Sequence, residues 1–479
     1  MGGISGLLET ARRALLAQQF GISVTGHNIA NANTTGYSRQ RADFVTTPAA
    51  STAYGLLGTG VTVASVSRLR NVFVDQQIRT SNSSLSAATS DYNILGQVEA
   101  TFNEPSDASM SGVLSGFFSA WQDLSTNPDD SVTRNALLLK GTALADTFHR
   151  LYSDTNTLRS SLRDELSTKI DSINTLAGQI SDLNVDIVAT TASGLNTADM
   201  KDLRDTKIEE LSNLANITVS EDEKGASLIS VGGTMIVGNG THLGLKVVAG
   251  AAATVSGTSF DQLRVVSDIG GSDVNMTGGE AGSIVKSFNT TIPDTLGRLN
   301  QLANAVITEV NAQQSAGYGR QSPPQSGINF FMGTDASSIA IDLTNPSAVL
   351  GSSPSIDNIA ASASATATGD NTIALSIAGV LNKRPLASSS GATLLGGLSI
   401  SEYYNQTVTS IGSAVNRADT AVQSQELVVS QLTEQQDGIA GVSLDEEMTN
   451  MIKFQRAYEA AAKVISAVDE MYTTLIQMV

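Results

Sequence analysis

Both ends of this 479-residue chain carry apolar residues at alternating spacings of four and three. Near the N-terminus six of eight such positions are apolar, and at the C-terminus nine of eleven are. This period is typical of coiled-coil helices, which bury a narrow apolar seam against a partner helix. The positions are Ile4, Leu8, Ala11, Leu15, Gln18, Ile22, Thr25 and Ile29 at one end, and Leu444, Met448, Met451, Gln455, Tyr458, Ala462, Ile465, Asp469, Tyr472, Ile476 and Val479 at the other.

The two stripes pose a burial problem, because an apolar seam needs a cover and chain ends are usually the least ordered parts of a protein. We expect the ends to stay loose in the monomer and to pack against neighbouring subunits in a polymer. The apolar members of both stripes then form the assembly seam. Pairing of the two ends within one chain is the alternative.

A polar segment, "GHNIANANTTGYSRQ" (residues 26–40), follows the first stripe. Asparagine tolerates the left-handed conformation and glycine adopts positive φ at little cost, so we expect the first helix to end here. The next residues, "YSRQRADFV", are predicted to be extended. Six residues are predicted to form a turn motif that redirects the chain: Asn28, Asn31, Asn33, Gly36, Tyr37 and Arg39.

Between the ends, helical spacing covers residues 72–102, a short helix ending at Leu124 and a very long helix reaching about residue 190. The sequence "STNPDDSV" predicts that Asn127 caps the long helix and that Pro128 lies in its first turn. Short apolar runs between Gly, Ser and Asn predict β structure from residue 217 to about 282.

These patterns predict a mainly α fold with β insertions, in which terminal coiled-coil helices and a long-helix body carry Gly-rich β outer modules. A chain of this length also exceeds the size of a single hydrophobic core. We expect residues 1–33 and 442–479 to form the terminal coiled-coil segments, 34–215, 279–317 and 400–441 a mostly helical body, 216–278 a β-rich module, and 318–399 a mixed or β outer module.

Composition excludes several classes of function. The net charge of −18 argues against a nucleic-acid partner, although residues 1–80 hold seven arginines against three carboxylates. The chain has no cysteine, which excludes disulfides, thiolate metal ligands and cysteine nucleophiles. It also lacks a stretch apolar enough for a secretory signal or a membrane span, so we expect no membrane insertion and no cleaved signal peptide.

No catalytic constellation is readable in the sequence. His27, His149 and His242 fall in three different predicted elements, without metal-ligand spacing. The glycine clusters match neither a phosphate-binding loop nor a dinucleotide fingerprint. The acidic run from Asp445 to Glu447 is explained by the start of a helix, with Ser443 and Glu446 as a capping box. We therefore expect no enzyme, and no catalytic, cofactor-binding or metal site.

Both ends resemble a known family. The segment "NIANANTTGYSRQ" resembles the N-terminal signature of flagellar rod, hook and hook-associated proteins, and its ending is closest to the hook-associated members. The segment "GVSLDEEMTNMIKFQRAYEAAAKVISAVDEMYTTLIQMV" is similar to the C-terminal signature of the same family. Three internal segments, "FFSAWQDLSTNPDDSVTRNAL", "GEAGSIV" and "LANAVITEVNAQ", extend the resemblance over roughly residues 1–215, 279–331 and 400–479.

The resemblance implies a structural subunit that joins the hook to the filament outside the cell. It would leave the cell through the flagellar type III export apparatus, with an export chaperone on its C-terminal helix. Its expected partners are further copies of itself in a ring or helical array, the hook protein and a second junction protein. The terminal helices would form the inner tube, and the β modules the exposed outside.

Two other functions remain open from the sequence. One is a different axial subunit, such as a hook protein or the second junction protein. The long helical body at residues 128–190 speaks against a hook protein, which is otherwise β-rich. The other is an enzyme carried on the flagellum, with its activity in residues 217–282 or 318–400.

Overall fold

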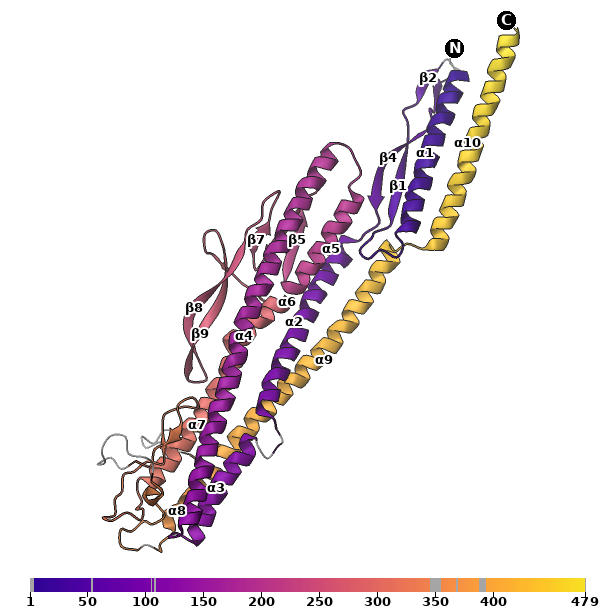
Figure 1. The fold of residues 1–479 in the computed structure, drawn as a ribbon. Helices are drawn as coiled ribbons and strands as arrows, with labels where there is room; N and C mark the ends of the chain where they lie inside the picture. The colour runs from indigo at the N-terminus through magenta and orange to yellow at the C-terminus, as the bar shows by residue number, and fades with distance from the viewer. Residues whose placement is uncertain are drawn as a thin grey trace.

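The computed structural model describes residues 4–52, 55–104, 106, 109–344, 355–367, 369–386 and 393–478. It is a long bundle of helices with small antiparallel sheets along one side, and both chain ends lie at the same extremity (Figure 1). The predicted fold class, mainly α with β insertions, is confirmed. None of the helices in the described ranges is long and apolar enough to cross a membrane.

One extremity is built from the first and last helices. Helix α1 (Ile4–Ala30) lies beside α10 (Leu444–Met478), and the two run in opposite directions (Figure 1). Strands β1 (Gln40–Thr46) and β4 (Val61–Arg68) form an antiparallel hairpin on α1, prolonged by the short pair β2 (Ala50–Thr52) and β3 (Gly55–Leu57). We call α1, β1–β4 and α10 the terminal unit.

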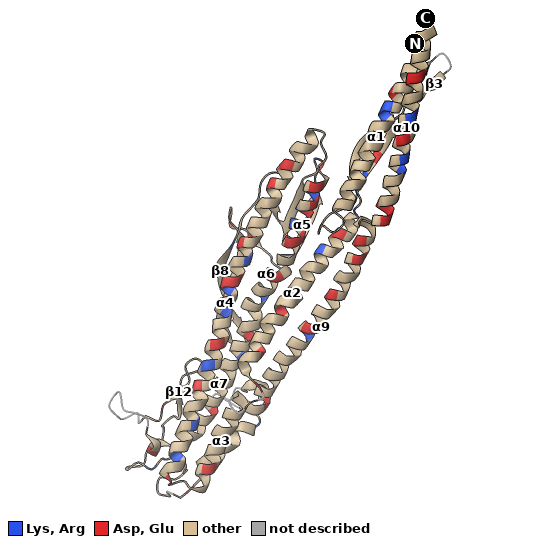
Figure 2. Cartoon of the chain, turned by 45° about the vertical axis from the view of Figure 1, so that its right-hand side comes forward, with Lys and Arg blue, Asp and Glu red and all other residues tan. Residues whose placement is uncertain are grey.

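The body of the molecule consists of long helices. Helix α2 (Val72–Phe102) pairs with α9 (Ile400–Ala440), while α3 (Met110–Thr126) packs on α4 (Ser131–Ala192), followed by α5 (Ala198–Leu214). Helix α4 has 62 residues, which corresponds to about 93 Å at 1.5 Å per residue. Acidic and basic residues are scattered along these helices, with several carboxylates on α9 and at the start of α10 (Figure 2).

The length of α4 follows from one unbroken stripe of buried residues. From Leu137 to Ile187 the buried side chains recur every three or four positions, so a single face stays on the core. The helix starts later than predicted. Asn127 ends α3, and the side chain of Asp130 caps α4 by accepting hydrogen bonds from the backbone N–H groups of Val132 and Thr133.

Two small sheets lie against α4. The first has the order β5 (Ile217–Glu221), β6 (Ser227–Val231), β7 (Thr234–Val237), and the second β10 (Asp273–Val274), β9 (Thr258–Ser267), β8 (Leu245–Val255). Asparagine side chains attach them to the helices. Asn184 exchanges two hydrogen bonds with the backbone of Ser227, and Asn174 does the same with Leu245. These amides satisfy strand backbone groups that would otherwise be buried unpaired.

Helix α6 (Gly279–Lys286) lies midway along the molecule beside α2 and α5, and a π-helical turn (Ser287–Thr291) joins it to α7 (Ile292–Gln314) (Figure 1). Helix α7 leads to the far end of the bundle, where α8 (Thr372–Ala378) packs on α3. Four aromatic rings from α3 and the segment after α7 pack on one another there: Phe117, Trp121, Phe330 and Phe331. The described part of residues 318–399 contains the two-residue strands β11 (Phe331–Met332) and β12 (Ala340–Ile341), helix α8 and three short 3-10 turns.

Candidate functional site

The terminal unit meets the body through a cluster of hydrogen-bonded and charged side chains, which we call the polar junction. It lies where α1 ends, where β1 begins, where β4 ends, and where α9 passes into α10. Its members come from segments more than 400 residues apart in the sequence. They are Asn28, Tyr37, Ser38, Arg39, Gln40, Arg68, Arg70, Asp75, Asp199, Asp202, Asp205, Glu446 and Glu447.

Asn28 is the centre of the junction and is fully buried. Its amide N–H₂ donates to the backbone carbonyl of Gln40 at 2.8 Å and to the Glu447 carboxylate at 2.9 Å. Its carbonyl oxygen accepts from the Tyr37 hydroxyl at 2.7 Å and from the Gln40 backbone N–H at 2.9 Å. All four hydrogen-bonding capacities of the amide are used, which fixes the end of α1 against both β1 and α10.

Arg39 connects the loop to the start of α10. Its guanidinium donates to Glu447 at 2.8 Å and to Glu446 at 2.7 Å, and its backbone N–H donates to the carbonyl of Ala440, the last residue of α9. Glu447 is buried. The acidic start of α10 therefore does more than favour the helix dipole, because two of its carboxylates bind this arginine. Ser443 accepts from the Glu446 N–H as one half of the predicted capping box.

Helix α5 holds the loop from the other side. The Asp202 carboxylate accepts from the Ser38 backbone N–H at 3.0 Å and from its hydroxyl at 2.7 Å. The Gln40 side chain donates to Asp199 at 2.6 Å. Burial and the neighbouring carboxylates raise the pKa of the Tyr37 hydroxyl above its usual range. Tyr37 thus keeps the proton that it donates to Asn28.

A second charged group fixes the end of β4 to the body. Arg68 donates to Asp202 and Asp205, each at 2.8 Å, and Arg70 reaches Asp205 at 3.0 Å and Asp75 at 3.0 Å. Burial by itself would raise the pKa of Asp205, but the adjacent arginines outweigh it and hold that pKa below its usual value. Asp205 therefore stays ionised and can bind both arginines at once.

The remaining turn-motif residues have different environments. Gly36 has φ +80, and a Cβ at this position would lie 2.5 Å from the Thr206 hydroxyl. Asn31 donates to the His27 carbonyl at 3.0 Å, which closes the last turn of α1. Asn33 is exposed. The structure thus brings Asn28, Tyr37 and Arg39 together, while Asn33 lies apart from them.

The terminal helices pair within the chain, which is the alternative to the loose ends that we expected. Phe454 of α10 packs against Gly21 of α1, where an added Cβ would lie 3.1 Å from the ring. The Phe454 ring also lies 5.9 Å from that of Phe44 in β1. A glycine at the contact lets the aromatic ring approach the α1 backbone closely.

The buried stripe of α10 differs by one residue from the predicted seam. Glu447, Ala461 and Val468 are buried, each one position before a position of the heptad stripe, namely Met448, Ala462 and Asp469. The heptad period alone could not choose between two adjacent stripes of α10, because both carry apolar residues.

The predicted seam residues differ in burial. Ala11 is buried; Ile4, Leu15, Ile22, Ile29, Met451, Ala462 and Ile465 are half-buried; Leu8, Leu444, Met448, Tyr458, Tyr472 and Ile476 are exposed. Val479 lies outside the described residues.

Sequence reasoning missed most carboxylates of the junction. Asp199, Asp202 and Asp205 recur at three-residue spacing in "DMKDLRD", at the start of α5. That spacing places them along one side of the helix, which was the available signal. Nothing in the sequence indicated that the arginines of residues 39–70 would meet them.

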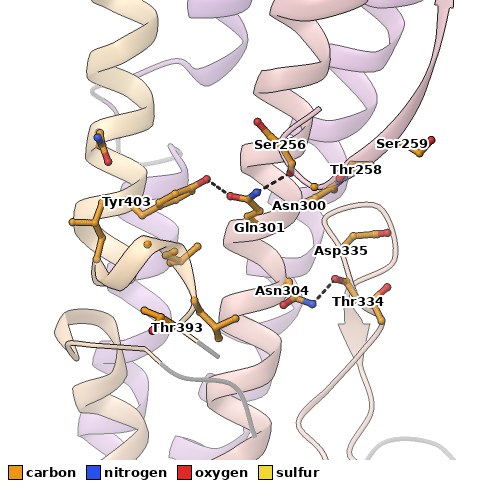
Figure 3. A pocket seen from close by; sticks show the side chains of 16 residues that line it. Ser256, Thr258, Ser259, Asn300, Gln301, Asn304, Thr334, Asp335, Thr393 and Tyr403 are labelled. Carbon is orange, nitrogen blue, oxygen red and sulfur yellow. Dashed lines mark hydrogen bonds between the residues drawn. The ribbon is translucent and has the colours of Figure 1, made fainter. Parts of the chain in front are cut away.

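A pocket lies far from the junction, between α7, α9 and the β8–β9 turn (Figure 3). It has a volume of about 840 Å³ and a polar lining. Tyr403 donates to Gln301 at 2.6 Å, Gln301 donates to the Ser256 carbonyl at 2.7 Å, and Asn304 donates to the Thr334 carbonyl at 2.9 Å. These amides hold the surrounding loops together. The described residues contain no group of three or more side chains suited to hold a metal ion.

The two ends of the chain define its class. Residues 8–37 match the family model "Flagella basal body rod protein", and residues 439–478 match "Flagellar basal body rod FlgEFG protein C-terminal". These two segments contain most of α1, five of the six turn-motif residues (all but Arg39) and all of α10. Both ends of the chain are thus similar to flagellar basal body rod proteins.

The middle of the chain and the full-length relatives specify the family. Residues 95–331 match "Flagellar hook-associated protein FlgK helical domain". The chain is 31% identical to flagellar hook-associated protein 1 of Bacillus subtilis, with 98% of this chain and 97% of that protein covered. It is 25% identical to the protein of the same name in Escherichia coli, with 99% and 100% covered. The chain belongs to the flagellar hook-associated protein 1 family and is a structural subunit of the bacterial flagellum.

A solved structure supports the fold. The flagellar hook junction protein FlgK of Burkholderia pseudomallei superposes with a TM-score of 0.59 at 15% identity, covering 76% of this chain and all of that one.

Proposed function

We propose that this chain forms the junction between hook and filament and assembles there with further copies of itself through α1 and α10. The observation that carries the proposal is the terminal unit, in which both chain ends lie together at one extremity of an elongated molecule (Figure 1). A subunit of this shape presents its ends to one region of an assembly and its β modules to another.

The apolar surface that α1 and α10 leave exposed supports assembly through them. Pairing covers one face of each helix, yet large apolar side chains remain exposed on both. Such a surface on a monomer marks a site of association. Its residues are Leu7, Leu8, Leu16 and Phe20 on α1, and Leu444, Met448, Ile452, Tyr458, Val464, Met471, Tyr472, Leu475, Ile476 and Met478 on α10.

The polar junction gives the terminal unit a fixed direction relative to the body. In the proposed arrangement the terminal helices line the axis, α2–α7 and α9 form a helical layer around them, and the β5–β7 and β8–β10 sheets face outward. The turn-motif residues Asn28 and Arg39 bind α10. The adjacent Ser38 and Gln40 bind Asp202 and Asp199 of α5, so this loop sets the angle between the first two layers.

Further partners follow from position and surface chemistry. The hook protein and a second junction protein are the neighbours on either side of such a ring. Before assembly the exposed apolar face of α10 needs a cover, which an export chaperone supplies on the way to the type III export apparatus. The proposed role is structural, with neither catalysis nor a cofactor.

Location on intact flagella tests the proposal. Because the chain has no cysteine, Glu223→Cys in the exposed β5–β6 turn allows a fluorescent maleimide to be attached at a single site. We expect one spot at the distal end of each hook. Label along the whole hook indicates a hook protein instead, and label along the filament contradicts the proposal as well.

A further inference from the structure

The last two turns of α10 extend past the end of α1. Asn28 bonds to Glu447, and Gly21 faces Phe454, so residue numbers on facing positions add up to 475. In this antiparallel register Ile4, the first residue of α1, lies opposite Met471. The residues that follow Met471 have no α1 residue beside them within the described chain. We call residues 471–478 the α10 tip.

The α10 tip has one broad apolar face. Met471, Tyr472, Leu475, Ile476 and Met478 are all exposed, with Ile476 at 74% and Met478 at 78%. Their spacing of i, i+4 and i+7, with a second stripe one residue later, is that of a helix that lays a broad apolar face into a groove. Exposure of this much apolar surface is unfavourable in water.

A groove of matching character lies on another face of the terminal unit. It runs between α1 and β4, has a volume of about 470 Å³, and is lined by Leu16, Phe20, Val61 and Val63, with Arg13 at one side. Leu16 is 55% exposed and Phe20 40% exposed. We call it the α1–β4 groove. It lies on α1 beside the α1–α10 contact, so a helix bound there would continue the same layer of helices.

The α10 tip and the α1–β4 groove match in length, and the segments that carry them have opposite net charges. Arg13 and Phe20, at two points along the groove, are seven residues apart on α1, as are Met471 and Met478 on the tip, and seven residues span about 10 Å of helix. Residues 4–68 carry five arginines against two carboxylates, a net charge of +3, whereas α10 has three basic and six acidic residues, a net charge of −3. After Lys463 the described part of α10 has only acidic charges, Asp469 and Glu470. Opposite charge favours their encounter.

A chain cannot fill its own groove. Leu16 lies opposite Glu459 in the α1–α10 register, and Leu475 is 16 residues further along α10, or about 24 Å away. A straight helix cannot turn back over that distance. The groove and the tip are therefore available only to different molecules.

We propose that the α10 tip of one copy of this chain binds in the α1–β4 groove of the next copy. This inference rests on the proposed function and specifies its contact. A patch that fits a pocket elsewhere on the same molecule makes a heterologous contact, which repeats around a ring or along a helix rather than closing as a two-fold dimer. Each copy thus offers one tip and one groove, as an axial subunit needs.

Disulfide trapping on assembled flagella tests the contact. Cells would express two versions of the chain in place of the native one, Leu16→Cys with a size tag and Leu475→Cys without it. Since the chain has no other cysteine, oxidation of isolated hook–filament preparations should give a disulfide-linked product of one tagged and one untagged chain. A disulfide requires Cα atoms within about 7 Å. The matched control replaces Leu475→Cys by Thr473→Cys, also exposed but on the opposite face of the helix.

The outcomes separate the two proposals. At least a fivefold excess of the mixed product over the Thr473→Cys control is expected. Assembled flagella with no excess over the control overturn the tip-in-groove contact and leave the hook–filament assignment intact. A Leu16→Cys product with the mass of a different flagellar protein overturns it too, because another chain then occupies the groove. Native chains that are absent from the flagellum overturn both proposals.

Discussion

At the scale of single residues, the polar junction distinguishes side chains that look alike in the sequence. Asn28 and Asn33 belong to the same run, "NIANAN", yet the first is buried with four hydrogen bonds and the second is exposed. Helix periodicity places Asn28 on the same face as Gly21 and Thr25, which are also buried. What it cannot supply is Glu447, because that partner is 419 positions away.

Gly36→Val should weaken the turn. At φ +80 a β-branched residue is disfavoured by more than the ~1–2 kcal/mol typical of other residues, and its Cβ would also meet the Thr206 hydroxyl. We expect a lower melting temperature and impaired motility. Gly36→Asn is the matched control, since asparagine tolerates this conformation better. Equal behaviour of the two variants would show that backbone conformation is not what the position requires.

Asn28→Asp should be destabilising at neutral pH and less so in acid. The new carboxylate replaces the amide that donates to Glu447, so two carboxylates face each other at about hydrogen-bond distance. Repulsion raises the pKa of the pair above that of an ordinary carboxyl, and the destabilisation is lost as the pH falls through that raised value.

Melting curves at pH 7 and pH 5 measure this effect. Asn33→Asp, at an exposed position of the same segment, should have the melting temperature of the native chain at both pH values. A loss of stability in Asn28→Asp that is the same at pH 7 and pH 5 would contradict the account of the junction.

At the scale of elements, the charged group around Asp205 attaches the terminal unit to the body. It joins the end of β4, the start of α2 and helix α5. The Gln436 side chain adds α9 by donating to Asp75 at 2.8 Å. Four elements therefore depend on the ionisation of a few carboxylates.

The pH dependence of this attachment has a defined sign. Because the folded-state pKa of Asp205 is lowered, its stabilisation is complete above the ordinary aspartate value of about 4 and is lost as the pH falls through the folded value. Glu209, whose pKa is raised by burial, acts in the opposite direction.

Asp205→Asn should lower the melting temperature at pH 7 and flatten the decline of the melting temperature between pH 5 and pH 3. A decline as steep as in the native chain would assign the acid sensitivity to other groups.

Ala462→Pro should open the terminal unit and leave the body folded. Proline removes a backbone donor in the middle of α10 and clashes with the preceding turn, at a cost of ~3 kcal/mol or more. Since α10 pairs with α1, both helices should lose protection in hydrogen exchange, while α4 keeps it. The control is Ala460→Ser, at an exposed position of the same turn. Unchanged protection of α1, or normal flagella, would contradict the role of this helix.

Elements were more predictable than their contacts. Helix α2 has the predicted bounds, and the long helix differs mainly at its start, where Asp130 rather than Asn127 is the cap. Local spacing and capping determine such features. Within the chain, the buried residues of α10 precede the predicted stripe by one position because Phe454 fits the space above Gly21, a property of two helices together. Likewise, nothing local identifies Asn174 and Asn184 as the residues that bind the first residues of β8 and β6.

At the scale of the whole molecule, the fold separates three surfaces. The terminal unit carries the exposed apolar residues of α1 and α10, the helical body connects it to the rest, and the two sheets lie along one side of α4 (Figure 1). The signatures at the two ends indicated a polymer subunit from sequence alone. The position of the sheets along α4 depends on buried contacts such as Arg159, which lies over the Phe288 ring at 4.0 Å and binds Asp261, and these are not readable from composition.

The most direct test of the central claim is a density map of the hook–filament junction on intact flagella, into which this chain is fitted. We predict that α1 and α10 surround the axis as paired helices, that the α10 tip of each copy contacts α1 of a neighbour, and that the β5–β7 and β8–β10 sheets lie on the outer surface. A map with the sheets at the axis, or with α1 and α10 exposed on the outside and free of contacts between copies, would contradict the account.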